Sequence, residues 1–210
     1  MLNLEKNFFK KRILIYGLGK SGLSTYSFLK KSNTISLFDD RIIAKKKIKD
    51  SHTTYQEITK EEFDCIIISP GIDINKCKLS RFLKKNHKKI YTDLDIFYSR
   101  YAFNQKITIT GTNGKSTTAK LLYDILKDQK KDVRLVGNIG NPILLEKKIK
   151  KDTLFVIEAS SYQLEYSKFF KTNISIILNI TPDHLERHKT IDKYVSAKFK
   201  LIKNQSKNDI

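Results

Sequence analysis

A lysine and two hydroxyl side chains, Lys115, Ser116 and Thr117, follow a glycine turn in the middle of this chain. Residues 106–110 alternate as a buried β-strand does, and residues 115–127 have the pattern of a helix. Such a junction binds phosphate, because backbone N–H groups converge on the anion and the helix dipole favours negative charge there. The lysine would reach the β- and γ-phosphates, and the serine hydroxyl would bind Mg²⁺. The sequence therefore predicts a nucleoside triphosphate site made by Gly111, Thr112, Asn113, Gly114, Lys115, Ser116 and Thr117.

An acidic residue and a histidine-containing loop follow two later apolar runs. Glu158 ends the run TLFVIE, where a carboxylate suits Mg²⁺, and an exposed strand end is the alternative. Residues 174–179 lead into TPDHLERH, which contains His184 and His188. This is not the H-E-x-x-H pattern of zinc proteases, and the leading proline disfavours a helix that presents both histidines. His184 could adjoin a metal or phosphate, or be a loop histidine held by hydrogen bonds.

One lysine lies in an apolar helical stripe. At 100° per residue along a helix of residues 191–203, Lys198 falls on one face with Ile191, Val195 and Ile202. Burial lowers the pKa of a lysine, and a neutral amine can react with CO₂ to give a carbamate anion able to bridge metal ions. The alternative is a lysine whose stem packs while its head reaches water. The stripe alone leaves both interpretations open.

A second glycine loop lies near the N-terminus, where residues 17–22 read Gly-Leu-Gly-Lys-Ser-Gly. This pattern is typical of a dinucleotide site, and Asp39 stands about twenty residues downstream as that site requires. Glycine lets the backbone approach a pyrophosphate, so NAD and a UDP-sugar would both fit, and a structural tight turn is the alternative. Ser69-Pro70-Gly71 adds a second loop at the same predicted sheet edge and favours a ligand crevice there.

Strands that alternate with helices must position these residues. Strands are predicted at residues 12–16, 34–38 and 63–68, and again at 106–110, 133–136, 153–158 and 174–179. This alternation indicates an α/β fold with parallel sheets and sites at the carboxyl ends of the strands. We expect a Rossmann-like domain over residues 1–98 and an incomplete P-loop ATPase domain over residues 99–210, with residues 95–105 as a connector.

The composition excludes several classes of protein. The net charge of +19 is the excess of 41 basic over 22 acidic residues. Six of the basic residues are arginine, and the lysines are scattered rather than interleaved with aromatic residues. A solvated surface explains them better than a nucleic-acid site. No stretch is long and apolar enough to span a membrane, and the N-terminus lacks a secretory signal, which favours a cytoplasmic protein. Cys65 lies in an apolar run and is predicted to be a core residue.

Six segments of the chain resemble segments of the Mur ligase family and occur in the same order as in that family. They are GLGKSGLS (17–24), SPGI (69–72), TGTNGKSTT (110–118), GNIGNP (137–142), EASSYQLE (158–165) and NITPDHLERH (179–188). The phosphate loop and the Asp-His element are shared by Mur ligases and folylpolyglutamate synthases. The SSYQLE element and the two N-terminal segments are more particular to the D-glutamate-adding branch of the family.

The resemblance implies an ATP-dependent ligase of peptidoglycan precursor synthesis. ATP would phosphorylate the alanyl carboxylate of UDP-N-acetylmuramoyl-L-alanine, and the amine of D-glutamate would attack the acyl phosphate to give an amide, ADP and phosphate. Lys115 would stabilise the transferring phosphoryl group. Ser116 and Glu158 would hold one Mg²⁺, and His184 with carbamylated Lys198 would hold a second.

The resemblance also implies the substrate residues and makes UDP, not NAD, the ligand of the first glycine loop. Asn138 would lie close to the reacting carboxylate. The residues expected to contact substrate are Lys20, Ser21, Asp39, Arg41, Ser69, Gly71, Asn138, Ser160 and Gln163.

Members of this family are longer than the present chain, because they complete the ATPase domain and add a third domain that binds the amino acid. We therefore expect an N-terminal half, monomeric, with little ligase turnover by itself. The alternatives are a non-catalytic UDP-sugar-binding module, a ligase of the folylpolyglutamate type and an NAD-dependent enzyme. An NAD-dependent enzyme would leave the predicted ATP loop without a function.

Overall fold

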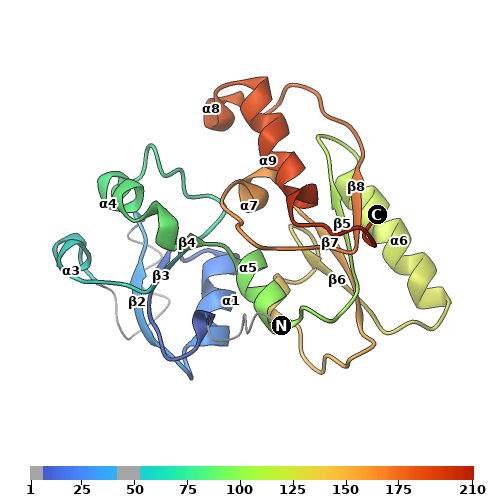
Figure 1. Ribbon diagram of the computed structural model, residues 1–210, viewed down its shortest axis with the longest axis horizontal. Helices are drawn as coiled ribbons and strands as arrows, with labels where there is room; N and C mark the ends of the chain where they lie inside the picture. Colours follow the sequence, from blue (N-terminus) through green and yellow to red (C-terminus); the bar gives the residue numbers. More distant parts are fainter. Residues whose placement is uncertain (1–6, 42–52) are drawn as a thin grey trace. The chain divides into compact units, whose positions relative to one another are not determined.

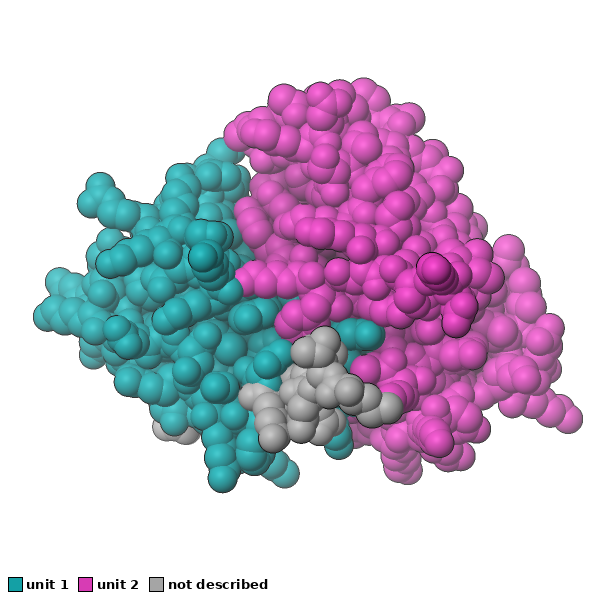
Figure 2. Space-filling model, in the orientation of Figure 1, with its two compact units in different colours: residues 1–100 teal, residues 101–210 magenta. Residues whose placement is uncertain are grey.

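The computed structural model describes residues 7–41 and 53–210 of the 210-residue chain. The chain divides into two compact units, residues 1–100 and 101–210 (Figure 2). Each unit is an α/β layer structure built on its own parallel four-stranded sheet. The boundary predicted between residues 98 and 99 falls within the last turn of helix α5 (Asp93–Arg100).

The first unit has the strand order β2-β1-β3-β4. Its strands are β1 (Arg12–Tyr16), β2 (Thr34–Phe38), β3 (Cys65–Ile68) and β4 (Ile90–Tyr91). Its helices are α1 (Lys20–Leu29), α3 (Tyr55–Lys60), α4 (Ser80–Lys85), the 3₁₀ turn η2 (His87–Lys89) and α5.

The strand order of the first unit places a topological switch point between β1 and β3. The chain passes from β1 to β2 on one side and then crosses to β3 on the other side of β1. Ligands of open α/β sheets bind at such a switch point, outside the carboxyl ends of the strands. The glycine loop follows β1 and the Ser-Pro-Gly loop follows β3, so both loops lie at this point. All four residues of β3 are buried, Cys65 among them, and the prediction of a core cysteine is confirmed.

The second unit has the strand order β6-β7-β5-β8 (Figure 1). Its strands are β5 (Lys106–Thr110), β6 (Val133–Gly137), β7 (Leu154–Glu158) and β8 (Ile174–Ile177). Its helices are α6 (Lys115–Asp128), the 3₁₀ turn η3 (Ile143–Leu145), α7 (Ser161–Glu165), α8 (Leu185–His188) and α9 (Ile191–Lys203).

The core of the second unit lies between α6 and the sheet. Ile109, Ala119, Val133 and Val156 are buried together, with Leu122 and further apolar side chains of α6 packed against them. Burial of such side chains contributes about 1.5–3 kcal/mol each. α9 packs against α7, α8 and β8 (Figure 1). These contacts hold the loops at the carboxyl ends of β5, β7 and β8 close to one another.

The structure corrects three details of the predicted elements. Residues 95–105 are not wholly a connector, because α5 continues to Arg100. The third strand begins at Cys65 rather than at residue 63. The buried face of α9 is also displaced, since Ile191 and Ile202 are 37% and 40% exposed. No helix among residues 7–41 and 53–210 is long and apolar enough to cross a membrane.

Candidate nucleotide-binding sites

The loop between β5 and α6 has the backbone of an anion site. Gly114 precedes α6 with φ of +81°, a left-handed conformation that glycine adopts without steric cost. α6 begins without a capping side chain. The N–H groups of its first turn therefore depend on solvent or a ligand, and the helix dipole favours an anion there.

A buried carboxylate lies directly behind this loop. Glu158 is fully buried at the end of β7 and is paired in register with Ile109 of β5. Its Oε2 accepts a hydrogen bond from the Ser116 hydroxyl at 2.9 Å, and its Oε1 accepts one from the Asn138 amide at 2.7 Å. The structure thus brings two sequence-predicted residues, Ser116 of α6 and Asn138 of the loop after β6, onto the carboxylate of a third, Glu158 of β7.

Two lysines donate to carbonyl groups of the same loop. Lys115 donates to the Thr112 carbonyl at 2.7 Å, and Lys198 donates to the Gly111 carbonyl at 2.7 Å. Lys198 is 1% exposed, and its ammonium lies 4.6 Å from the centre of the Tyr194 ring. Burial, together with the charge of Lys115, lowers the pKa of Lys198 to about 8. Lys198 is therefore a buried amine, and the snorkelling alternative is wrong.

Asn179 and Tyr194, which follow β8, hold the phosphate loop in place, and the sequence analysis assigned neither of them a role. The carbonyl of Asn179 accepts the Thr112 N–H at 2.9 Å, and the Asn179 side chain accepts the Asn113 N–H at 2.9 Å. The Thr112 hydroxyl lies 3.1 Å from the Tyr194 hydroxyl. An asparagine at the end of a strand next to a phosphate loop was the signal available for Asn179.

The two histidines of the TPDHLERH segment lie in different surroundings. His184 is the N-terminal cap of α8, with φ of +53° and a side chain 3.4 Å from Asp183. His188 ends α8, is buried, and its Nε2 lies 3.0 Å from the Ser161 hydroxyl. Burial lowers the pKa of His188. The expectation of a loop here is corrected to a one-turn helix, and His188 is packed inside the unit.

In the first unit, close packing accounts for two of the three loop glycines. A Cβ on Gly22 would overlap the carbonyl oxygen of Gly17, and a Cβ on Gly17 would come within 2.8 Å of Ser69 Cβ. A Cβ on Gly19 or on Gly71 would meet no atom of the described residues within 4 Å. The open space above these two glycines is what a ligand approaching the backbone requires.

Hydrogen bonds between polar side chains and backbone groups hold this loop in place. Asp39 is buried and its carboxylate accepts the Leu18 N–H at 2.6 Å and the Arg41 N–H at 2.8 Å. The Ser69 hydroxyl donates to the Gly17 carbonyl at 2.7 Å. The Arg41 guanidinium lies 3.5 Å from Asp39 and its side chain is 77% exposed. Lys20, in the first turn of α1, is exposed.

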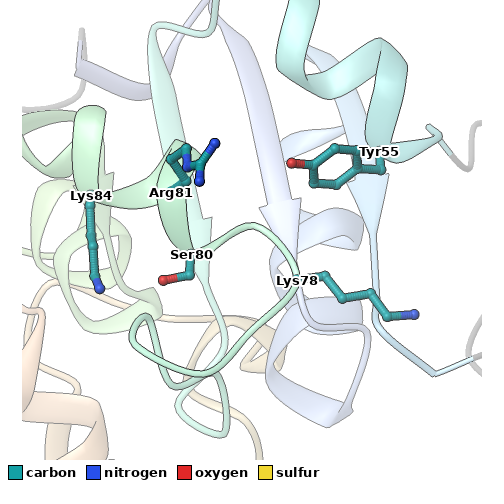
Figure 3. A pocket seen from close by; sticks show the side chains of 5 residues that line it. All are labelled: Tyr55, Lys78, Ser80, Arg81 and Lys84. Carbon is teal, nitrogen blue, oxygen red and sulfur yellow. The ribbon is translucent and has the colours of Figure 1, made fainter.

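A cavity of about 570 Å³ lies between α3 and α4 in the first unit. Figure 3 shows Tyr55 on α3 with its hydroxyl turned toward α4, where Ser80, Arg81 and Lys84 lie, and Lys78 on the preceding loop. The Lys78 ammonium donates to the Asp40 carbonyl at 3.3 Å, which places the cavity beside the end of β2. None of the sequence-predicted residues is among these five, and three cations make the cavity favourable for an anion.

Two protein families match this chain, one in each of its two compact units. The family described as "Mur ligase MurD-like, N-terminal domain" matches residues 11–90, and "Mur ligase middle domain" matches residues 109–210. The chain belongs to the Mur ligase family.

Curated relatives of this Mur ligase chain are longer than it is. A protein of Caldicellulosiruptor bescii named UDP-N-acetylmuramoylalanine–D-glutamate ligase is 38% identical over 211 residues, which cover 92% of this chain and 45% of the relative. A protein of Rickettsia bellii with the same name is 35% identical over 204 residues, which cover 95% of this chain and 45% of the relative. The chain therefore spans about half the length of the curated relatives it matches.

Solved structures support the Mur ligase fold. UDP-N-acetylmuramate:L-alanyl-gamma-D-glutamyl-meso-diaminopimelate ligase from Neisseria meningitides aligns over 95% of this chain and 70% of its own, with a TM-score of 0.59 and 14% identity. UDP-N-acetylmuramate-alanine ligase from Thermotoga maritima aligns over 92% of this chain and 47% of its own, with a TM-score of 0.53 and 21% identity. At these identities the likeness establishes the fold.

Mur ligases use ATP and Mg²⁺, and the residues behind the phosphate loop fit a magnesium ion. The Ser116 hydroxyl and the Glu158 carboxylate are oxygen donors 2.9 Å apart, beside a helix N-terminus open to phosphate. Mg²⁺ is bound in this way, by one or two protein oxygens together with phosphate and water. Among the described residues no three His, Cys, Asp or Glu side chains gather as a metal group.

Ser160 and Gln163 form a local structure in this Mur ligase chain. The Ser160 hydroxyl accepts the Gln163 N–H at 3.3 Å, and the Gln163 side chain accepts the Ser160 N–H at 3.0 Å. This reciprocal pair is a capping box that starts α7. Gln163 is 4% exposed, so its amide serves the helix, and any contact with substrate stays a prediction.

Proposed function

We propose that this chain carries the two nucleotide-binding domains of a Mur ligase that adds D-glutamate to UDP-N-acetylmuramoyl-L-alanine at the expense of ATP. In this proposal residues 1–98 bind the UDP-linked substrate and residues 99–210 bind ATP. The observation that carries the proposal is the arrangement of Ser116, Asn138 and Glu158 behind an open phosphate loop. The names of the relatives support the choice of D-glutamate.

At the ATP end, phosphoryl transfer depends on position and charge. Lys115 would leave the Thr112 carbonyl and contact the β- and γ-phosphates, since its ammonium already lies within the loop. Ser116 and Glu158 would hold Mg²⁺, which neutralises charge on the phosphoryl group when bound. The alanyl carboxylate would take that group, and the amine of D-glutamate would displace phosphate to form the amide.

A second magnesium site would use His184 and Lys198. The buried amine of Lys198 would react with CO₂, losing one proton and forming a carbamate anion, which a lowered pKa favours. Asn138, held by Glu158, would lie next to the reacting carboxylate of the substrate.

The UDP moiety would lie over the glycine loop of the first unit. The open space at Gly19 and Gly71 supports this position. Lys20, Ser21 and Arg41 would contact the nucleotide directly, whereas Asp39 and Ser69 would shape the loop through the hydrogen bonds that they already make. Ser160 and Gln163 complete the proposed set of substrate residues.

We expect a monomer that works in the cytoplasm, where ATP and UDP-linked sugars are made. Because the chain spans about half of its relatives, we expect little or no turnover from these 210 residues alone. Robust D-glutamate-dependent release of phosphate by the purified chain would contradict that expectation.

Calorimetric titration with MgADP tests the ATP end. Lys115→Met should weaken binding at least tenfold, because it removes the cation nearest the phosphates. Lys120→Met is the matched control, since Lys120 lies on the same helix but forms an exposed ion pair with Asp124. Equal affinities for the two variants would overturn the ATP assignment and leave a UDP-sugar-binding module as the better description.

Titration with UDP-N-acetylmuramoyl-L-alanine, UDP and NAD tests the UDP end. We expect saturable binding of UDP-N-acetylmuramoyl-L-alanine and of UDP, and no binding of NAD. Binding of MgADP without UDP would favour a ligase of the folylpolyglutamate type, and binding of NAD would mean that the glycine loop has been misassigned.

A further inference from the structure

A buried carboxylate that the reaction does not use contacts the first glycine loop. Asp93 is the first residue of α5 and is 3% exposed. Its Oδ2 lies 2.5 Å from the hydroxyl oxygen of Ser21, in the first turn of α1. Its Oδ1 accepts the Leu94 N–H at 3.0 Å. Among the described residues the carboxyl therefore has one hydrogen-bond partner outside its own helix, and that partner is a proposed ligand of the nucleotide.

The Ser21 hydroxyl carries a single hydrogen, which decides what it can offer to a phosphate. When Asp93 is ionised, it can only accept, so the hydrogen of Ser21 points to the carboxylate and lone pairs face the nucleotide. When Asp93 is protonated, its own O–H donates to Ser21, and the hydroxyl hydrogen is released toward the phosphate. Only the protonated state lets Ser21 serve as a donor to an anion.

We infer that Asp93 positions the Ser21 hydroxyl, and that the nucleotide binds the first unit in the state in which the Asp93 carboxyl holds a proton. At pH values where Asp93 is ionised in the free protein, binding of the UDP-linked substrate would then take up one proton, and the affinity would fall as pH rises. Asp93 is a positioning residue, since it acts through Ser21. This inference rests on the proposed UDP site.

The surroundings of Asp93 favour the proton. Burial raises the pKa of Asp93, the hydrogen bonds from Ser21 and Leu94 oppose that rise, and the charge of Asp95 adds to it. On α1 the neighbouring titratable group is the exposed Lys20, and across the loop Asp39 accepts the Leu18 N–H. A phosphate arriving at α1 adds negative charge, which favours the protonated carboxyl further.

Titration of the full chain with UDP-N-acetylmuramoyl-L-alanine between about pH 5.5 and about pH 8 tests the inference, because both phosphates of this probe are esterified and remain ionised throughout that range. Wild-type affinity should fall by up to about tenfold per pH unit above the pKa of Asp93. Asp93→Asn should bind equally well across the range, because an amide donates to Ser21 at every pH. Ser21→Ala should bind about tenfold more weakly at low pH and show a smaller pH dependence, because only the repulsion between Asp93 and the phosphate remains.

Asp95→Asn is the matched control. Asp95 is buried on the same helix, but its carboxylate accepts from the N–H of Thr92 at 3.1 Å and lies 3.3 Å from the Thr92 hydroxyl. This variant should keep the slope of affinity against pH, and the fall should begin at a lower pH because the charge of Asp95 no longer raises the pKa of Asp93. Wild-type binding that is constant with pH, or an Asp93→Asn variant that keeps the wild-type slope, overturns the inference while leaving the UDP site intact. No binding by the folded wild-type chain at any pH overturns the proposed site, and the inference with it.

Discussion

At the residue scale, one carboxylate organises the proposed ATP site. Glu158 is fully buried, and each of its oxygens accepts one hydrogen bond, from Ser116 and from Asn138. Burying a charge is costly unless it is paired or hydrogen-bonded, so these two donors are part of what permits a carboxylate there. A bound magnesium ion would add the compensating charge.

Glu158→Gln should therefore remove the magnesium dependence of nucleotide binding. The amide nearly preserves the shape of the side chain but carries no charge for a cation. We expect MgADP to bind no better than ADP with a chelator, whereas the wild-type chain should show at least a tenfold difference. Calorimetry with and without Mg²⁺ measures both values, and an unchanged magnesium effect would contradict this role.

The glycines of the first loop give a second test, because two of them face different surroundings. Gly19→Ala should leave thermal stability nearly unchanged, since its Cβ would meet no atom within 4 Å in the part of the chain that the structure describes, yet it should weaken UDP binding by filling the space above the loop. Gly22→Ala should destabilise the first unit by several kcal/mol, because its Cβ would overlap the Gly17 carbonyl. Comparison of melting temperature and UDP affinity separates the two effects; a Gly19→Ala variant with normal affinity would argue against a ligand there.

At the scale of elements, strand β5 begins with a second buried lysine outside the proposed site. Lys106 is 1% exposed, and its ammonium donates to the carbonyls of Ala102 and Asn104. Burial lowers its pKa to about 7, and the charge of Lys171, which is paired with Asp209 at 2.8 Å, contributes. The strand that delivers the phosphate loop therefore carries a costly cation at its start.

This cation predicts a pH dependence of stability. An unfolded chain keeps lysine protonated up to about pH 10.5, so between pH 7 and that value the unfolded state binds more protons than the folded state. The free energy of unfolding should rise with pH across this window, by up to about 1.4 kcal/mol per pH unit from this group. Urea unfolding at about pH 7.5 and about pH 9.5 should show a smaller rise for Lys106→Met. The buried Lys198 is present in both proteins, so their difference reports on Lys106, and equal rises would contradict its lowered pKa.

At the scale of the whole molecule, the chain has two compact units, each with its own sheet and its own glycine loop. A ligand stabilises the part of a protein that binds it, by an amount set by its concentration and dissociation constant. The two proposed nucleotides should therefore act on different units.

Hydrogen exchange measured with each nucleotide tests this division. UDP-N-acetylmuramoyl-L-alanine should slow exchange in the strands of residues 1–100, and MgADP should slow exchange in those of residues 101–210. Lys115→Met should abolish the second effect and spare the first. Protection of the first unit by MgADP alone would contradict the assignment of the two sites.

The pattern of residues was sufficient for much of the fold. The bounds of β1, β2, β5 and α9 were predicted without error, because each is framed by glycine, proline or polar residues and keeps one periodicity. The buried face of α9 was placed too near Ile191 and Ile202, since periodicity gives a stripe but not the neighbour that covers it. Helix α5 was not predicted, because residues 95–105 were interpreted as a connector, and the burial of Asp93 and Asp95 depends on packing that a local pattern does not show.

The sequence alone determined the kind of chemistry: a glycine-lysine-serine loop after a β-strand, a carboxylate at the end of another strand, and a lysine in an apolar helix. These follow from local pattern and residue type. Only the tertiary structure decided which groups meet, that Glu158 joins Ser116 to Asn138, that Asn179 and Tyr194 brace the phosphate loop, and that Asp93 faces Ser21. Each of these contacts joins residues far apart in the chain, and its partner is fixed by strand order and helix packing, which no local window of sequence contains.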